Sequence, residues 1–226
     1  MIKTKKKGLL IVLSGPSGVG KDTVSDAVLK ENPNLWKSIS MTTRSPRENE
    51  VEGKDYYFVS EEEFQKRIQE DKFLEYATFN HHFYGTPKDK VAEKLNEGKD
   101  VILVIEIQGA LQIKERIKQA LFIFLLPPSM DVLKKRLTKR NTDSAYAIDE
   151  RFKTAYQEIN ELPKYHYVIV NDTVEAASKK LNAILISERC RVDRIEELYL
   201  DTIEEKVHEK LVDNKKLENS EIKIDL

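Results

Sequence analysis

Short apolar runs alternate along the chain with longer stretches that have the residue spacing of amphipathic helices. Four runs are apolar at nearly every position, which is typical of strands that helices cover on both faces. These runs are 9–13, 101–105, 121–126 and 167–170. The helical stretches are 23–31, 87–97, 108–117, 130–139, 148–161 and 174–191. This alternation predicts an α/β fold with a doubly wound parallel core sheet and flanking helices.

Two segments interrupt the alternation. Residues 36–86 are rich in Tyr, Phe, Thr and Arg, with short strand candidates at 55–59 and 83–86 around a helix at 61–71. They predict a small mixed α+β subdomain inserted into the main fold. A polar stretch, 140–147, separates two predicted helices and has the character of a mobile flap or lid.

The last 34 residues differ in composition from the rest, since half of them are charged. Ile195, Tyr199, Ile203, Val207 and Leu211 recur at four-residue spacing, so one helical stripe could pack on the body of the protein or on a partner chain. A homodimer is therefore one option. Beyond residue 213 nothing in the sequence favours an ordered structure.

Overall composition narrows the classes of partner. The chain has 38 Lys+Arg against 39 Asp+Glu, a net charge of -1, which argues against a protein that binds nucleic acid by bulk attraction. The single Cys190 excludes internal disulfides and Cys-rich zinc sites, and fits a reducing compartment. No apolar run approaches the ~20 residues of a membrane span, and the run 9–13 is too short for a signal peptide. We expect a cytoplasmic protein without nucleic-acid or membrane partners.

The strongest chemical signal is a glycine-rich phosphate loop between the first predicted strand and the first helix. Glycines let successive N–H groups point at anionic oxygens, the helix N-terminus adds partial positive charge, and a lysine supplies a full one. The strict motif has Ser or Thr after the lysine, whereas here a carboxylate follows, which phosphate would repel unless it turns outward or faces a cation. The loop consists of Gly15, Pro16, Ser17, Gly18, Val19, Gly20, Lys21, Asp22 and Thr23.

Beyond this loop the chain resembles the guanylate kinase family, whose members pass a phosphoryl group from ATP to GMP. The resemblance covers about residues 8–190 in the family's order. It rests on SMTTRSPR at 40–47, GKDYYF at 53–58, FLEY at 73–76, YGT at 84–86, IEIQG at 105–109, PPS at 127–129, arginines at 136, 140 and 151, and VIVND at 168–172. These blocks together are far more specific than the phosphate loop alone.

The resemblance implies a role for each site residue. Catalytic residues would be Lys21, Arg136, Arg140 and Arg151, with the arginines closing over the phosphates. ATP would lie on the loop 15–23, with Asn171 near its adenine. The implied GMP site comprises Ser40, Arg44, Arg47, Tyr56, Glu75, Tyr84, Thr86 and Glu106. The implied domain is 1–192, with a core at about 1–35, 87–138 and 152–192, an acceptor-binding subdomain at 36–86, a lid at 139–151 and the tail 193–226.

The chemistry of the acceptor agrees with this implied site. GMP carries about two negative charges, which the forks of Arg44 and Arg47 can grip bidentately. Guanine presents two N–H donors beside an oxygen acceptor, so a carboxylate at Glu75 and a hydroxyl at Thr86 would favour it over adenine. No general base is needed, because the attacking phosphate oxygen is already ionised at neutral pH.

Mg²⁺ is the cofactor that the resemblance implies, with ATP as co-substrate. Thr23 is the hydroxyl ligand that the loop offers. Relatives often carry a second acid two residues before Glu106, where this chain has Val104, so metal handling would shift onto Glu106, Thr23 and Asp22.

Two other functions remain open from the sequence. One is a guanylate-kinase-like module that binds phosphopeptides without catalysis, against which the presence of Lys21 and the lid arginines argues. The other is a kinase for a different phosphorylated acceptor, such as a ribose bisphosphate, against which Glu75 with Ser40 and Thr86 argues.

Overall fold

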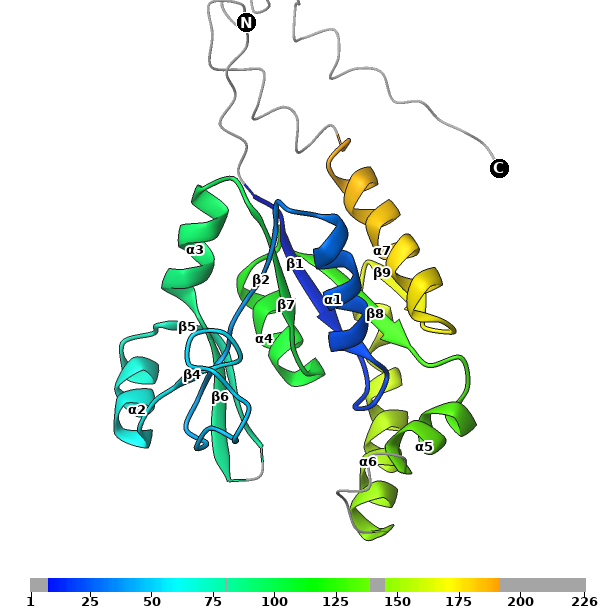
Figure 1. The fold of residues 1–226 in the computed structure, drawn as a ribbon, viewed down its shortest axis with the longest axis horizontal. Helices are drawn as coiled ribbons and strands as arrows, with labels where there is room; N and C mark the ends of the chain where they lie inside the picture. The colour runs from blue at the N-terminus through cyan, green and yellow to red at the C-terminus, as the bar shows by residue number, and fades with distance from the viewer. Residues whose placement is uncertain (1–7, 80, 139–144, 192–226) are drawn as a thin grey trace, which may run out of the picture. The chain divides into compact units, whose positions relative to one another are not determined.

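The computed structural model describes residues 8–79, 81–138 and 145–191. Its core sheet has five strands, all parallel, in the order β2-β7-β1-β8-β9. Their bounds are β1 Leu10–Ser14, β2 Leu35–Lys37, β7 Asp100–Val104, β8 Leu121–Leu126 and β9 Tyr167–Val170. The first strand, β1, lies in the middle of the sheet, between β7 and β8 (Figure 1). The predicted α/β fold with a parallel core sheet is confirmed.

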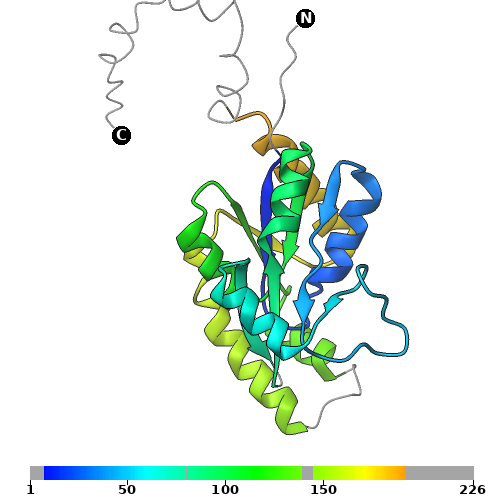
Figure 2. The ribbon, with the colours of Figure 1, turned by 90° about the vertical axis from the view of Figure 1, so that its left-hand side faces the viewer.

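Helices follow the strands much as the sequence predicts, with differences of at most three residues at their ends. They are α1 Lys21–Glu31, α3 Lys88–Asn96, α4 Ile107–Arg116, α5 Met130–Thr138, α6 Ala145–Ile159 and α7 Val174–Glu188, with a short 3₁₀ helix at Leu162–Lys164. Pro87 differs from the prediction, since it ends the preceding strand and caps α3 instead of starting its first turn. In Figure 2, α1 lies on one side of the core sheet and α4 on the other.

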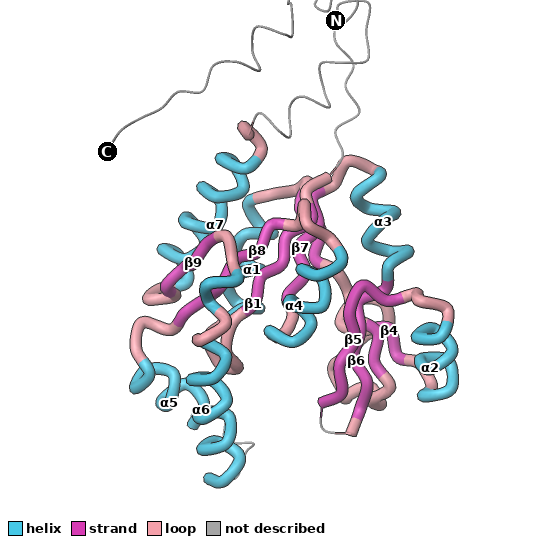
Figure 3. Tube along the Cα trace, turned by 180° about the vertical axis from the view of Figure 1, so that it is seen from behind, coloured by secondary structure: helices cyan, strands magenta, loops and turns pink. Residues whose placement is uncertain are grey.

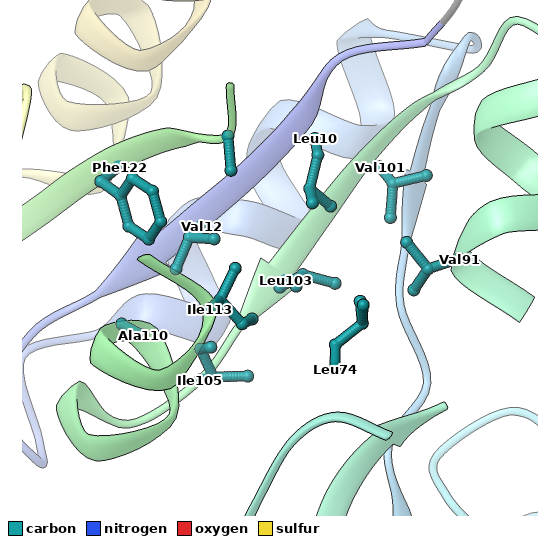
Figure 4. Packing of buried hydrophobic residues seen from close by; sticks show 11 residues of the cluster. Leu10, Val12, Leu74, Val91, Val101, Leu103, Ile105, Ala110, Ile113 and Phe122 are labelled. Carbon is teal, nitrogen blue, oxygen red and sulfur yellow. The ribbon is translucent and has the colours of Figure 1, made fainter. Parts of the chain in front are cut away.

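The core explains why the central strand is apolar at every position. Leu10 and Val12 of β1 belong to a cluster with Leu103 of β7 and Ile113 of α4 (Figure 4). The alternate residue Ile11 points to the opposite face and is also fully buried. Because both faces are covered, polar alternation is absent from β1, and the apolar run is the sequence signature of this burial.

A second, smaller sheet holds the segment that interrupts the alternation. Its four strands run in the order β4-β3-β6-β5, with a parallel β3–β4 pair and antiparallel β3–β6 and β5–β6 pairs. The bounds are β3 Met41–Thr42, β4 Tyr57–Phe58, β5 Phe73–Phe79 and β6 His82–Pro87, with α2 at Glu61–Gln69. Phe64 of α2 stacks on Phe73 with ring centroids 4.4 Å apart, which anchors the helix to the sheet. Figure 3 shows α2 beside the strands of this small sheet. The mixed α+β character predicted for this segment is confirmed.

The sequence analysis did not predict three of the strands, β2, β3 and β5. The strands β2 and β3 have only three and two residues and include Trp36, Lys37 and Thr42, so they show neither an apolar run nor a clear alternation. In the structure Trp36 and Lys37 pair with β7 in the core sheet, although the sequence analysis put them in the inserted segment. The longer β5 is an edge strand with a register shift near Glu75, which blurs its pattern.

Several sequence predictions fall on residues outside those that the structure describes. They are Arg140, the lid residues 139–144 and the tail 193–226 with its apolar stripe. Within the three described segments, no helix combines the length and apolar character needed to cross a membrane.

Candidate active site

The candidate site lies at the carboxyl edge of the core sheet. The glycine-rich loop follows β1, Glu106 follows β7, and Asn171 follows β9. Since all five strands are parallel, these ends meet at one edge, where the connection after β1 leads through α1 to β2 and the connection after β7 leads through α4 to β8, in opposite directions along the sheet. Ligands in such sheets bind where the connections diverge. Residues far apart in the sequence are thereby brought to one place.

The loop between β1 and α1 has the curled backbone that phosphate binding requires. Gly20 has φ 99° and ψ 30°, a left-handed conformation that favours glycine. A Cβ at Gly20 would also lie 2.7 Å from the Nδ2 of Asn171, so there is no space for a larger residue. The N–H of Val19 donates to the carbonyl of Pro16 (3.2 Å), which closes the turn. The backbone can then present its N–H groups to an anion.

Lys21 is held at the centre of this loop. Its side chain is 9% exposed, and its Nζ donates to the carbonyl of Gly15 at 2.7 Å. The same Nζ lies 3.2 Å from Oε1 of Glu106, a carboxylate that is 58% exposed. The lysine is thus fixed by the loop and by the end of β7, with a solvent-accessible acid beside it.

Arg136 and Asn171 support the loop from two other elements. The guanidinium of Arg136, on α5, donates to the carbonyls of Val19 (3.2 Å) and Asn171 (3.1 Å). The Nδ2 of Asn171 also donates to the Val19 carbonyl (2.8 Å). Arg136 therefore contacts the loop directly, and the buried Asn171 lies against it as well.

The two residues that follow Lys21 are both exposed. Thr23 is exposed in the first turn of α1. The side chain of Asp22 is 75% exposed, and its Oδ1 accepts from the Nζ of Lys37 at 3.0 Å. The sequence analysis left two placements open for this carboxylate, outward or toward a cation, and the structure shows it exposed and paired with the Lys37 ammonium.

A cluster of cationic and phenolic groups lies on the small sheet. The guanidinium of Arg44 lies 5.3 Å from the ring centroid of Tyr56, and the rings of Tyr56 and Tyr84 are 6.0 Å apart. These three predicted residues are brought together. Arg47 is exposed on the same loop, and its backbone N–H donates to Glu50.

Glu50 is a member of this cluster that the sequence analysis missed. Its two carboxylate oxygens accept from Nη1 and Nη2 of Arg44 at 2.9 and 2.8 Å, a bidentate pair. The Arg44 guanidinium lowers the pKa of Glu50 to about 2. The carboxylate occupies the arginine fork much as a phosphate would. Its place three residues after Arg47 was the only sequence signal.

Glu75 and Thr86 form a buried polar pair on neighbouring strands. They face each other in the β5–β6 register, and the Thr86 hydroxyl donates to Oε1 of Glu75 at 2.6 Å. Glu75 is 6% exposed, and burial raises its pKa to about 7 despite the hydrogen bonds from Thr86. Ser40 is half-buried just before β3, at the start of the same sheet.

Gly109 limits where the Glu75 carboxylate can lie. A Cβ at position 109 would be 2.4 Å from Oε2 of Glu75, because the first turn of α4 packs directly on that oxygen. We expect Gly109→Ala to displace the Glu75 carboxylate. The KM for an acceptor whose base contacts this carboxylate should then rise by about ten- to a hundredfold. Alanine favours the helix, so thermal stability should change little.

Steady-state kinetics with the acceptor varied would test this, with Glu115→Ala, exposed on the last turn of α4, as the matched control. An unchanged acceptor KM in Gly109→Ala would show that Glu75 adapts freely.

Glu158, on α6, is another residue that the sequence analysis did not single out. It is half-buried, and burial raises its pKa to about 7, with the charge of Glu106 adding to the effect and that of Lys21 opposing it. It therefore lies within electrostatic reach of the loop lysine. Glu158 is seven residues after Arg151, with the buried Ala155 between them, so this helical spacing was the signal available.

The fold and the loop together are those of a nucleotide-binding protein of the P-loop class. The chain matches the family model described as guanylate kinase over residues 7–188. The guanylate kinase of Clostridium acetobutylicum is 54% identical over 208 residues, covering 92% of this chain and 99% of its own. That of Clostridium tetani is 55% identical, covering 92% and 100%. The crystal structure of guanylate kinase from Anaplasma phagocytophilum aligns with a TM-score of 0.71 at 34% identity, covering 90% of this chain and 98% of that one.

The chain belongs to the guanylate kinase family. It is accordingly an ATP-dependent nucleoside monophosphate kinase, and the resemblance drawn from the sequence is confirmed. The comparisons do not favour the phosphopeptide-binding module or the kinase for a ribose bisphosphate.

Proposed function

We propose that this protein transfers the γ-phosphoryl group of ATP to GMP, with ATP bound on the loop 15–23 and GMP on the small sheet. The observation that carries the proposal is the contact of Lys21 with Glu106. It joins the donor loop to an accessible acid at the end of the neighbouring strand, 3.2 Å away. Donor and acceptor phosphates would meet at this point.

In the proposed reaction a phosphate oxygen of GMP attacks the γ-phosphorus, and the bond to the bridging oxygen breaks to release ADP. Negative charge moves toward that bridging oxygen, so cations fixed near it accelerate the step. Lys21 would supply one such charge, while Arg136 holds the loop in shape through Val19. The remaining contribution is alignment of two bound substrates.

Acceptor recognition would divide between two clusters. Arg44, with Tyr56 and Tyr84 beside it, would hold the GMP phosphate once the fork is released from Glu50, and Arg47 would join them. Glu75 would accept from the guanine N–H groups, with Thr86 and Ser40 contributing hydroxyls. Adenine in this pocket would leave the carboxylate mispaired.

Magnesium fits the residues present. Among the residues that the structure describes, no group of three or more His, Cys, Asp or Glu side chains is arranged to hold a metal ion unaided. Mg²⁺ is commonly bound by one or two carboxylates together with substrate phosphates, and Glu106 and Thr23 offer oxygen atoms of that kind. When bound, the ion would neutralise charge on the phosphates.

The remaining parts of the proposal concern organisation. The core, the acceptor-binding subdomain, which begins after β2 and runs to about residue 86, and the lid at 139–151 would close on the substrates, with Arg140 and Arg151 reaching the phosphates. A cytoplasmic location accords with the lone cysteine. A homodimer through the tail would give a doubled mass in sedimentation, lost on truncation at residue 192.

A coupled assay of ADP release tests the activity directly. Purified protein with Mg²⁺ and ATP would be offered GMP, dGMP, AMP, UMP and ribose phosphates in turn. We expect GMP to give the highest kcat/KM, with AMP and UMP at least about a hundredfold lower. Absence of GDP formation, or preference for a ribose phosphate, would refute the proposal.

A further inference from the structure

Asp22 occupies a position that should weaken the donor site. It directly follows Lys21 and is the second residue of α1. Acidic side chains stabilise a helix N-terminus when nothing is bound. Once the phosphates of ATP lie at the same terminus, the carboxylate and the phosphates repel each other. A binding loop with this residue therefore needs a way to hold the carboxylate aside.

Lys37 is the group that contacts this carboxylate. Its Nζ lies 3.0 Å from Oδ1 of Asp22 and 3.1 Å from Oδ1 of Asp26, so one ammonium joins two acids one helical turn apart. Lys37 is 29% exposed, whereas Asp22 and Asp26 are 75% and 56% exposed. The cation is thus the more firmly placed partner, and it draws the acids toward β2.

The electrostatics of the three groups agree with this geometry. Partial burial of Lys37 lowers its pKa, but the charges and hydrogen bonds of Asp22 and Asp26 together outweigh burial and raise the pKa overall. The ammonium therefore stays charged across the physiological range. The charge of Asp22 also reaches the Tyr56 phenol and contributes to raising its pKa, after burial and Tyr84. Asp22 consequently lies within electrostatic reach of the acceptor cluster as well.

The backbone explains why Lys37 can serve as an anchor. It is the last residue of β2, and the next N–H, that of Ser38, donates to the carbonyl of Ile102 at 3.0 Å. Four residues after Lys37 the chain enters the small sheet at Met41. Lys37 thus stands on the core sheet at the point where the chain leaves it.

We propose that Lys37 is a positioning residue that holds Asp22 away from the phosphates of bound nucleotide and so preserves ATP binding on a loop with an acid after its lysine. The inference rests on the proposed binding of ATP at residues 15–23. Lys37 does not contact the nucleotide in this proposal. It acts through Asp22, with Asp26 as a second anchor for the ammonium.

The test is a double-mutant cycle on Lys37 and Asp22 in the full chain, read out as KM for ATP, KM for GMP and kcat. Lys37→Met should raise the KM for ATP by about tenfold and the KM for GMP by less, with kcat within about twofold. Lys37→Arg should restore most of the ATP affinity, because it keeps the charge. In an Asp22→Ser background, Lys37→Met should change the KM for ATP by less than about twofold.

Two results would overturn the proposal. Either Lys37→Met leaves the KM for ATP unchanged, or it raises that KM equally in the Asp22→Ser background, which would mean that Lys37 contacts the phosphates itself. Lys30→Met, which removes an exposed lysine near the end of α1, is the matched control and should leave the KM for ATP within about twofold. If Lys37→Met does not fold, Lys37→Gln is used in the same cycle.

Lys21→Met in the same ATP titration separates the two levels of inference. A large loss of ATP affinity in Lys21→Met, with unchanged ATP affinity in Lys37→Met, would refute only the role of Lys37. Unchanged ATP affinity in Lys21→Met would refute ATP binding on the loop and with it the proposed function.

Discussion

Lys21→Met is expected to lower kcat by about a thousandfold or more. The lysine is almost fully buried against the loop carbonyls and Glu106, so its charge is fixed where the transferred phosphoryl group would lie. Removing one fixed charge or donor from a preorganised site typically costs about 10²–10³ in rate, and a full cation at a phosphoryl group lies at the upper end.

The measurement is single-turnover formation of GDP at saturating ATP, with GMP binding followed by calorimetry. GMP affinity should stay within about threefold of the parent, because the acceptor cluster is on the small sheet. Lys30→Met, in the last turn of the same helix and exposed, is the matched control and should retain activity. Normal turnover in Lys21→Met would contradict the role given to this residue.

Glu75→Gln is expected to raise the KM for GMP by about a hundredfold and to abolish most of the preference for GMP over AMP. The carboxylate offers only acceptors, whereas an amide places a donor against a guanine N–H and leaves it buried without a partner. Because Glu75 is 6% exposed and already bonded to Thr86, water cannot readily relieve that mismatch. The kcat/KM ratio of GMP to AMP is the measurement.

The pH dependence of GMP binding gives a second readout for Glu75. Burial raises its pKa to about 7, so the free protein increasingly carries a protonated carboxyl as the pH falls below that value. GMP requires the ionised form, so its affinity should fall with pH, by up to about tenfold per unit below pH 7.

The part of the pH dependence of GMP affinity that Glu75 contributes should vanish in Glu75→Gln. It should persist in Glu70→Gln, an exposed control at the end of α2. A GMP-to-AMP preference that survives Glu75→Gln would remove this residue from base reading. Folding follows the same linkage. Since the pKa of Glu75 in the folded protein lies above its ordinary value of 4.5, the ionisation of Glu75 makes the folded state less stable as the pH rises from about 4.5 to 7.

The parts of this fold that could be predicted are those whose causes are local. The strand β1 and the loop after it occupy consecutive residues. Because β1 is buried on both faces, its residues form a continuous apolar run that is visible in the sequence. The strands β2 and β3 could not be found in this way. Their few residues gain their hydrogen bonds from β7 and β6, which lie more than forty residues away.

The site shows the same division. Motifs located Arg44, Tyr56 and Tyr84, and the structure gathers them on one sheet. The motifs did not indicate that the Glu50 carboxylate would pair with the Arg44 guanidinium. They also did not indicate that Glu158 would lie within electrostatic reach of Lys21. Each of these depends on how a loop folds back or how a helix lies against the sheet, and single-sequence patterns carry no such information.

Sequence alone determined that this chain forms a parallel sheet with a phosphate loop and belongs to a kinase family. Apolar runs that alternate with amphipathic stretches, and motifs of consecutive residues, can be recognised from neighbouring residues in the chain. Tertiary structure decided the electrostatic partners: Lys37 for Asp22, Glu50 for Arg44, and the close approach of Gly109 to Glu75. Coulomb forces and steric exclusion depend on distance in space, and that distance is set only when strands far apart in the chain end at the same edge of a sheet.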